Sequence, residues 1–267
     1  MSARRLAVIA GRGQLPPTLI RAAGPGFAEI RAYALDAATP DLGVPTERAA
    51  LSQLPELFAA IKAFGATHVV LAGAIDLPRT ARTGLARALG GSGHETGDVP
   101  LSNLAARIGA LTGATLVSIP DIAPQLVVTA GVLAGPALSA DDEARGQAAL
   151  VAALGVGALD LGQSVVLADF RPIAAEDAGG TDALLRRVAQ LQAAGQGGTP
   201  LTFAKAKKRQ QPTFVDLPVI GPETIAGCVA AGVTLIALEA GTTLIVDRDA
   251  VLRAADAADI RLWGGHV

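Results

Sequence analysis

The sequence predicts an α/β protein built from a Rossmann-like N-terminal domain and a second α/β domain, with a ligand cleft between them. The chain has 267 residues, enough for two domains of ordinary size. About half of it (51%) is hydrophobic, which supplies a sizeable core. Short apolar runs alternate with helical patterns, as parallel strands joined by crossover helices do. We expect the domains to span residues 1–132 and 133–267.

Composition narrows the classes of function. The formal net charge is −2, so the overall electrostatic field does not attract nucleic acid. Aromatic residues make up only 3%, which leaves few side chains on which bases could stack. Cys228 is the only cysteine, which excludes an internal disulfide and suits a reducing cytoplasm. No apolar run reaches the roughly 18 residues of a transmembrane helix. We therefore expect a cytoplasmic protein.

The N-terminal domain opens with a strand and a helix. Leu6–Ala10 is a short apolar run that ends at Gly11, which is typical of a buried parallel strand. Pro16 and Pro17 suit the first turn of a helix that continues to about Ala23.

The rest of this domain follows the same alternation. Gly65 is the expected C-cap of a helix, and the glycine-rich stretch Gly131–Pro136 is the expected link to the second domain. We expect strands at Ile30–Leu35, His68–Ala72 and Thr115–Ile119, and a helix at Leu54–Phe64.

The second domain begins with a helix signal. Ser139 is a good N-cap, and the acids that follow it suit the first turn of a helix running to about Leu154. Further on, we expect strands at Ser164–Ala168, Leu201–Ala206, Thr234–Leu238 and Thr243–Val246, and helices at Thr181–Gln192 and Gly221–Ala231.

Two glycine turns are candidate ligand contacts in the N-terminal domain. Gly11 and Gly13 follow a strand and precede a helix, where backbone N–H groups can approach an anion. Pro16 replaces the third glycine of the dinucleotide fingerprint, which disfavours an NAD-type oxidoreductase. Gly73 ends another strand, and because the carboxyl ends of parallel strands share one edge, we expect the two turns to lie close together. A tight turn without a ligand explains each of them equally well.

Candidate residues in the second domain suit phosphate chemistry. Thr181 and Asp182 open a helix, either as a simple cap or facing a phosphate or its metal ion. Lys205–Arg209 is a dense basic run, either a solvated loop or a phosphate-binding segment. Asp216 interrupts a short apolar stretch, where a carboxylate needs a cation and suits a hard metal.

Seven short blocks keep one order across nearly the whole chain: Leu6–Pro16, Leu159–Gln163, Gly180–Arg187, Lys205–Lys207, Val215–Gly221, Glu239–Gly241 and Val246–Arg248. This ordered set resembles the bacterial UDP-2,3-diacylglucosamine pyrophosphatases of the I type, which act in lipid A biosynthesis. The resemblance implies hydrolysis of UDP-2,3-diacylglucosamine to UMP and 2,3-diacylglucosamine 1-phosphate. It also implies a divalent cation, usually Mg²⁺, and a homodimer. A diacylated substrate further suggests peripheral contact with the inner membrane.

The resemblance assigns roles to particular residues. Asp216 falls on the family's essential aspartate, which we assign to catalysis and to metal binding. The expected substrate-binding residues are Gly11, Gly13, Gln14, Leu15, Gly73, Gln163, Thr181, Asp182, Lys205 and Gln211.

Four positions depart from the family's usual pattern. Gly179 replaces a Glu, Pro212 an acid and Phe214 an Arg, and Ala74 stands in the first-domain turn where Asn or Lys is usual. These departures leave an alternative open. The chain is then a divergent protein that binds a nucleotide or lipid precursor without hydrolysing it, or that takes another substrate.

Overall fold

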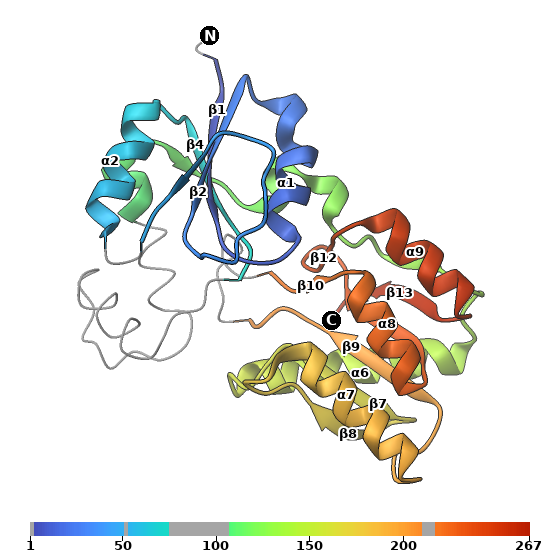
Figure 1. Ribbon diagram of the computed structural model, residues 1–267. Coiled ribbons are helices and arrows are strands. Elements are labelled where there is room, and N and C mark those ends of the chain that lie inside the picture. The colour runs from blue at the N-terminus through green and yellow to red at the C-terminus, as the bar shows by residue number, and fades with distance from the viewer. Residues whose placement is uncertain (1–2, 51–52, 75–106, 210–216) are drawn as a thin grey trace. The chain divides into compact units, whose positions relative to one another are not determined.

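A computed structural model describes residues 3–50, 53–74, 107–209 and 217–267 of the chain (Figure 1). The described residues form two compact units, one up to Leu126 and one from Val127 on. Each unit has its own sheet, so the mixed α/β class is confirmed for both. None of the described helices is both long and apolar enough to cross a membrane.

The N-terminal unit is a five-stranded sheet in the order β3-β2-β1-β4-β5, with every neighbouring pair parallel. The chain moves outward from β1 in both directions, which is the Rossmann-like winding expected. Helices α1 and α2 lie on opposite sides of this sheet (Figure 1). Its elements are β1 Arg5–Ala10, α1 Leu15–Ala23, β2 Glu29–Ala34, β3 Thr46–Arg48, α2 Leu54–Phe64, β4 His68–Ala72, β5 Thr115–Leu116 and α5 Ile119–Ile122, with short 3-10 turns at Gly24–Gly26 and Pro124–Leu126.

Local sequence explains most of these boundaries. Helix α2 ends at Gly65, whose φ of 70° is the left-handed conformation that glycine adopts readily. The strand expected at Thr115–Ile119 is shorter than predicted, because Ser118 starts a helix. Its N–H and hydroxyl donate to Asp121 Oδ2 at 2.9 and 2.6 Å, and Pro120 occupies the first turn.

The C-terminal unit is a six-stranded mixed sheet in the order β6-β13-β11-β9-β7-β8, accompanied by a parallel pair, β10 and β12. Strands β9, β11 and β13 are parallel, whereas β7 runs antiparallel to β9. Its elements are β6 Gly131–Ala134, α6 Ala140–Ala158, β7 Ser164–Ala168, β8 Arg171–Ala175, α7 Gly180–Ala193, β9 Leu201–Lys205, β10 Val219–Ile220, α8 Pro222–Ala231, β11 Val233–Glu239, β12 Leu244–Ile245, α9 Arg248–Ala257 and β13 Arg261–Gly265.

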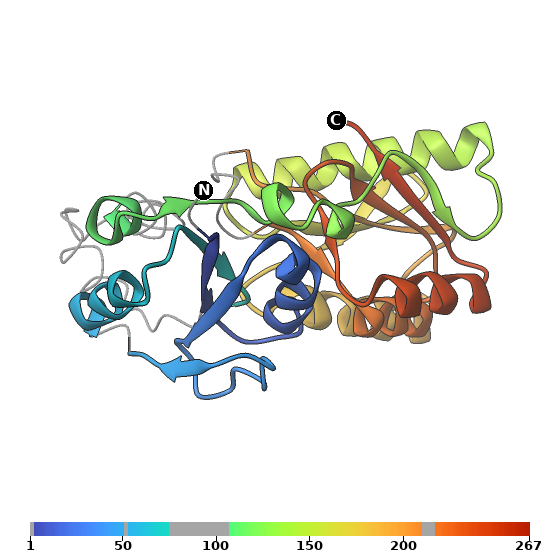
Figure 2. The same cartoon turned by 90° about the horizontal axis from the view of Figure 1, so that it is seen from above.

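Helices cover both faces of this sheet. Helix α6 packs on one face, and α7, α8 and α9 pack on the other (Figure 2). Successive strand residues divide between the two cores, since Val165 contacts the α6 side and Val166 the α7 side. The largest differences from expectation are that α6 continues to Ala158 and that residues 131–134 of the expected linking stretch form β6, antiparallel to β13.

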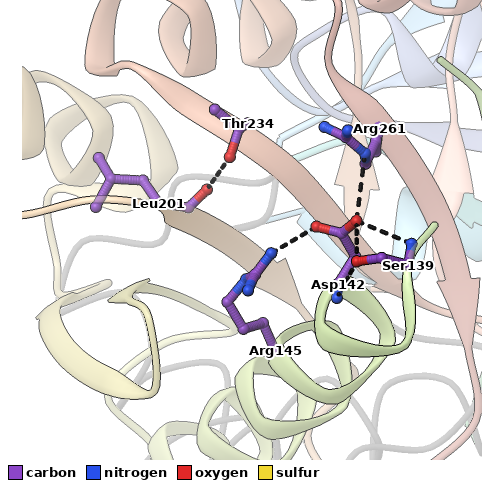
Figure 3. A network of polar contacts seen from close by, with 6 residues as sticks. All are labelled: Ser139, Asp142, Arg145, Leu201, Thr234 and Arg261. Atoms are coloured by element: carbon purple, nitrogen blue, oxygen red, sulfur yellow. Dashed lines mark hydrogen bonds and ion pairs between the residues drawn. The ribbon is translucent and has the colours of Figure 1, made fainter. Parts of the chain in front are cut away.

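A buried polar network fixes the start of α6 (Figure 3). Asp142 Oδ2 accepts the backbone N–H and the hydroxyl of Ser139 at 3.0 and 2.7 Å, which confirms Ser139 as the N-cap. Arg145 Nη2 lies 2.6 Å from Asp142 Oδ1, and Arg261 Nε lies 3.5 Å from Oδ2. Burial opposes ionisation of Asp142, but these hydrogen bonds and charges outweigh it and lower the pKa of the carboxyl. The network ties α6 to the first residue of β13.

Candidate active site

The strand order gathers charged side chains at one edge of the C-terminal sheet. Lys205 ends β9 beside Leu238, and Glu239 ends β11. The antiparallel strand β7 starts at the same edge, with Ser164 opposite Lys205, so Gln163 lies there too. Gln163, Lys205 and Glu239 are all buried. The carboxyl edge of parallel strands is where α/β sheets place their ligands, which makes this edge the candidate site.

Four residues at this edge form what we call the Lys205 cluster: Gln163, Glu176, Thr181 and Lys205. Lys205 Nζ donates to Thr181 Oγ1 at 2.6 Å and lies 3.9 Å from Glu176 Oε2. The same carboxylate oxygen accepts the Thr181 hydroxyl at 3.4 Å and the Gln163 backbone N–H at 3.3 Å. The structure therefore brings together three of the residues predicted from the sequence, and adds Glu176.

A second carboxylate lies beside the cluster, and the basic run folds against it. Glu239 Oε2 accepts the backbone N–H of Lys207 at 2.8 Å, and Glu239 Oε1 lies 2.8 Å from Arg209 Nη1. Lys208 Nζ lies 2.8 Å from Asp160 Oδ1. Burial lowers the pKa of Lys207, reinforced by Arg209 and opposed by Glu239. These contacts show that the run is an ordered cationic edge and not a freely solvated loop.

Thr181 and Asp182 are adjacent in sequence, but their side chains lie in different environments. Thr181 contacts Lys205, whereas Asp182 is exposed and lines a groove between α7 and α8. The groove has a volume of about 190 Å³, and Arg186 and Glu223 line it too. Gly227 lets the two helices approach, because a Cβ there would lie 2.8 Å from a Leu185 methyl carbon.

In the N-terminal unit, the two glycine turns do lie side by side. The Gly11 N–H donates to the carbonyl of Ala72 at 2.8 Å, and Arg12 and Ala74 exchange backbone hydrogen bonds at 2.7 and 3.1 Å. A Cβ on Gly11 would lie 2.3 Å from the Ala74 carbonyl oxygen, and one on Gly73 would lie 2.5 Å from that of Arg12. Contact between the turns therefore requires both glycines, with or without a ligand.

The remaining candidates of this turn differ in exposure. Gly13 has a φ of 90° and open space around its Cα, and Gln14 is exposed beside it. Leu15 is buried at the start of α1. Asp36 is the second residue after β2, and its Oδ2 lies 3.2 Å from Arg12 Nε. This charged pair at the turn was not predicted from the sequence.

Comparison with known proteins decides the family. Residues 5–88 match the LpxI N-terminal domain, and residues 129–263 match the LpxI C-terminal domain. The chain belongs to the LpxI family. It is 34% identical over 272 residues to the UDP-2,3-diacylglucosamine pyrophosphatase LpxI of Caulobacter vibrioides, covering 95% of this chain and 94% of that protein. This confirms the family resemblance inferred from the ordered blocks.

Among solved structures, a GalE-like L-threonine dehydrogenase from Cupriavidus necator is similar to 99% of this LpxI-family chain and 90% of its own. The two share 13% identity with a TM-score of 0.31, a likeness too weak to carry any inference.

The metal site predicted for this LpxI-family chain centres on Asp216. Asp216 and Gln211, two of the predicted site residues, lie outside the described residues. Within those residues, no three His, Cys, Asp or Glu side chains lie close enough to hold a metal ion. Glu176 and Glu239 face cationic groups instead. Cys228 is buried in α8, and burial raises the pKa of its thiol, which makes it a poor nucleophile or metal ligand.

The family departure at Gly179 has a local explanation. Gly179 donates its N–H to Asp177 Oδ1 at 2.8 Å, and a Cβ there would lie 2.8 Å from Ala183 Cβ. A larger residue would therefore need this turn to shift. In this segment the acid that turns toward Lys205 is Glu176, directly after β8. In the sequence, Glu176 is marked only as an acidic residue that directly follows a strand.

Proposed function

We propose that this LpxI-family chain hydrolyses UDP-2,3-diacylglucosamine to UMP and 2,3-diacylglucosamine 1-phosphate (lipid X), a step of lipid A biosynthesis. The observation that carries the proposal is the Lys205 cluster, in which a buried lysine meets the hydroxyl of Thr181 at a sheet's carboxyl edge. The relative from Caulobacter vibrioides, named for this activity, matches along nearly the whole chain.

The chemistry of the cluster suits a pyrophosphate bond. Cleavage of such a bond relies on positioning and on neutralising charge on the phosphoryl oxygens. Lys205 is a buried cation placed beside the Glu176 carboxylate, so its ammonium group needs little reorganisation when an anion arrives. The first turn of α7 starts next to Lys205, and its N–H groups favour negative charge. In this account Lys205 holds a phosphate oxygen of the substrate.

A divalent cation, most simply Mg²⁺, is part of the proposal, with Asp216 as its ligand and as the catalytic aspartate. A bound cation would supply further neutralisation of phosphate charge. The support is the position of this acid in a short apolar stretch downstream of the basic run Lys205–Arg209.

The other predicted contacts are proposed as substrate-binding residues. Gly13 and Gln14 offer an open turn in the N-terminal unit, which suits a nucleotide. We propose the same role for Gly11, Leu15, Gly73, Gln163, Thr181, Asp182 and Gln211. A homodimer and peripheral contact with the inner membrane complete the proposal; light scattering and flotation with phospholipid vesicles test these two points.

The test is UMP release from UDP-2,3-diacylglucosamine by wild type and by Asp216→Ala, each with magnesium and with a chelator. We expect metal-dependent release by wild type and a loss of about 100-fold or more in the variant. The thermal unfolding curve of each protein serves as the control for folding. Folded wild type that releases no UMP would contradict the proposal, and stabilisation by the substrate without turnover would favour the binding-only alternative.

A further inference from the structure

Glu176 is the acceptor that the members of the Lys205 cluster share. It directly follows β8, and its backbone N–H donates to the Ser164 carbonyl at 2.9 Å, which holds its main chain against β7. Its side chain is only 15% exposed. A largely buried carboxylate is costly unless it meets cations and hydrogen-bond donors, and here it meets both.

A glycine makes room for this carboxylate. A Cβ on Gly162 would lie 2.5 Å from Glu176 Cβ and 2.8 Å from its Cγ. These distances are shorter than any tolerated contact between carbon atoms, so the stem of Glu176 occupies the space that a side chain at position 162 would need. Gly162, the residue directly before Gln163, therefore packs tightly against the side chain of Glu176.

The hydrogen-bond directions define what the carboxylate does. Lys205 Nζ can only donate, so Thr181 Oγ1 accepts from it at 2.6 Å. The hydroxyl hydrogen of Thr181 is then left to point at Glu176 Oε2, 3.4 Å away. Glu176 Oε2 also lies 3.9 Å from Lys205 Nζ, so one oxygen orients the hydroxyl and attracts the ammonium group.

We propose that Glu176 is a positioning residue, whose carboxylate holds Thr181 and Lys205 in the arrangement that receives a phosphate oxygen of the substrate. This inference rests on the proposed function. Glu176 acts through its two neighbours, because a carboxylate in direct contact with a phosphate oxygen would repel it. Its negative charge is the essential property, since hydrogen bonding alone could be met by an amide.

The principal variant is Glu176→Gln, which keeps the size of the side chain and an oxygen that accepts from Gln163. We expect kcat for UMP release to fall about 10- to 100-fold while KM changes less than about threefold, because the lost interaction positions groups for the transition state. Glu176→Asp keeps the charge and should recover part of the loss. Glu143→Gln, the same change at an exposed position in α6, is the matched control and should leave kcat within about twofold.

A second readout needs no turnover. Reductive methylation of Lys205 in the free protein, followed by mass spectrometry, reports how strongly its ammonium group is held. We expect Glu176→Gln to increase the methylation rate of Lys205 about threefold or more relative to Lys62, because the neutral amine is the reactive form and the variant lacks the neighbouring anion. Gly162→Ala displaces Glu176 without removing it, and should shift both readouts in the same direction.

The outcomes separate this inference from the proposed function. Wild-type kcat together with unchanged Lys205 methylation in folded Glu176→Gln would overturn the role of Glu176. If wild type itself releases no UMP, the proposed function fails, but the methylation rates still decide whether Glu176 holds Lys205. If Glu176→Gln does not fold, Gly162→Ala decides: normal kcat and normal methylation in that variant would also overturn the inference.

Discussion

Each edge of the C-terminal sheet has a largely buried carboxylate beside basic side chains, but the contact distances differ. At the amino edge, Asp142 makes contacts of 2.6 to 3.5 Å with Ser139, Arg145 and Arg261 (Figure 3). At the carboxyl edge, the contacts of Glu176 Oε2 are longer, from 3.3 to 3.9 Å. Short contacts that join a helix start to a strand stabilise the fold. Longer contacts around a lysine and a hydroxyl leave both groups able to adjust to an anion.

The comparison predicts that removing a charge has different effects on activity and on stability at the two edges. Loss of a charge at the carboxyl edge should reduce activity far more than stability. Loss of a charge at the amino edge should reduce stability and spare activity.

The largest effect is expected at Lys205. Lys205→Met keeps the apolar stem but removes the cation that we assign to a phosphate oxygen. We expect kcat/KM for UMP release to fall about 10²- to 10³-fold, equivalent to about 3–4 kcal/mol of transition-state stabilisation. Activity within threefold of wild type would show that Lys205 does not serve the reaction.

A smaller effect, on stability, is expected at the amino edge. Asp142→Ala removes the shared acceptor of the Ser139 N-cap and leaves Arg145 and Arg261 without that carboxylate. We expect the free energy of unfolding to fall by about 2–3 kcal/mol, measured by urea denaturation, with kcat unchanged at a temperature where the variant is folded. A loss of activity in the folded variant would contradict the claim that the amino edge contributes to stability but not to activity.

The smallest effect is a dependence on pH. The pKa of Asp142 is lowered in the folded protein, so its contribution to stability is complete above the unfolded value of about 3.9 and is lost as the pH falls through the folded value. As the pH falls below about 5, we expect wild type to lose stability more steeply than Asp142→Asn. Parallel curves for the two proteins would show that Asp142 contributes nothing to acid sensitivity.

Several strands and helix caps could be predicted from the sequence, whereas β3, β8, β13 and α9 were not predicted. The apolar runs at Leu6–Ala10 and Ser164–Ala168 are strands, Ser139 caps α6 and Gly65 ends α2. The C-terminal end of α6 could not be predicted from the sequence, because it depends on tertiary packing. The helix continues through Gly157, whose Cα hydrogen faces Lys208, with a Cβ there only 3.3 Å from Lys208 Cγ.

The family resemblance predicted every member of the Lys205 cluster except Glu176. Gln163, Thr181 and Lys205 converge because β7, β9 and the start of α7 meet at one edge. Asp182 is separated from Thr181 because successive helix residues point about 100° apart. Glu176 was missed because its approach over Gly162 is a tertiary contact that no local pattern records.

The most direct test of the account is to measure UMP release and the free energy of unfolding for Lys205→Met and Asp142→Ala side by side with wild type. The account predicts that Lys205→Met loses about 100-fold or more in activity while remaining folded, and that Asp142→Ala is active but less stable. If instead Asp142→Ala lost activity while folded and Lys205→Met kept it, the carboxyl edge of the C-terminal sheet would not be the active site.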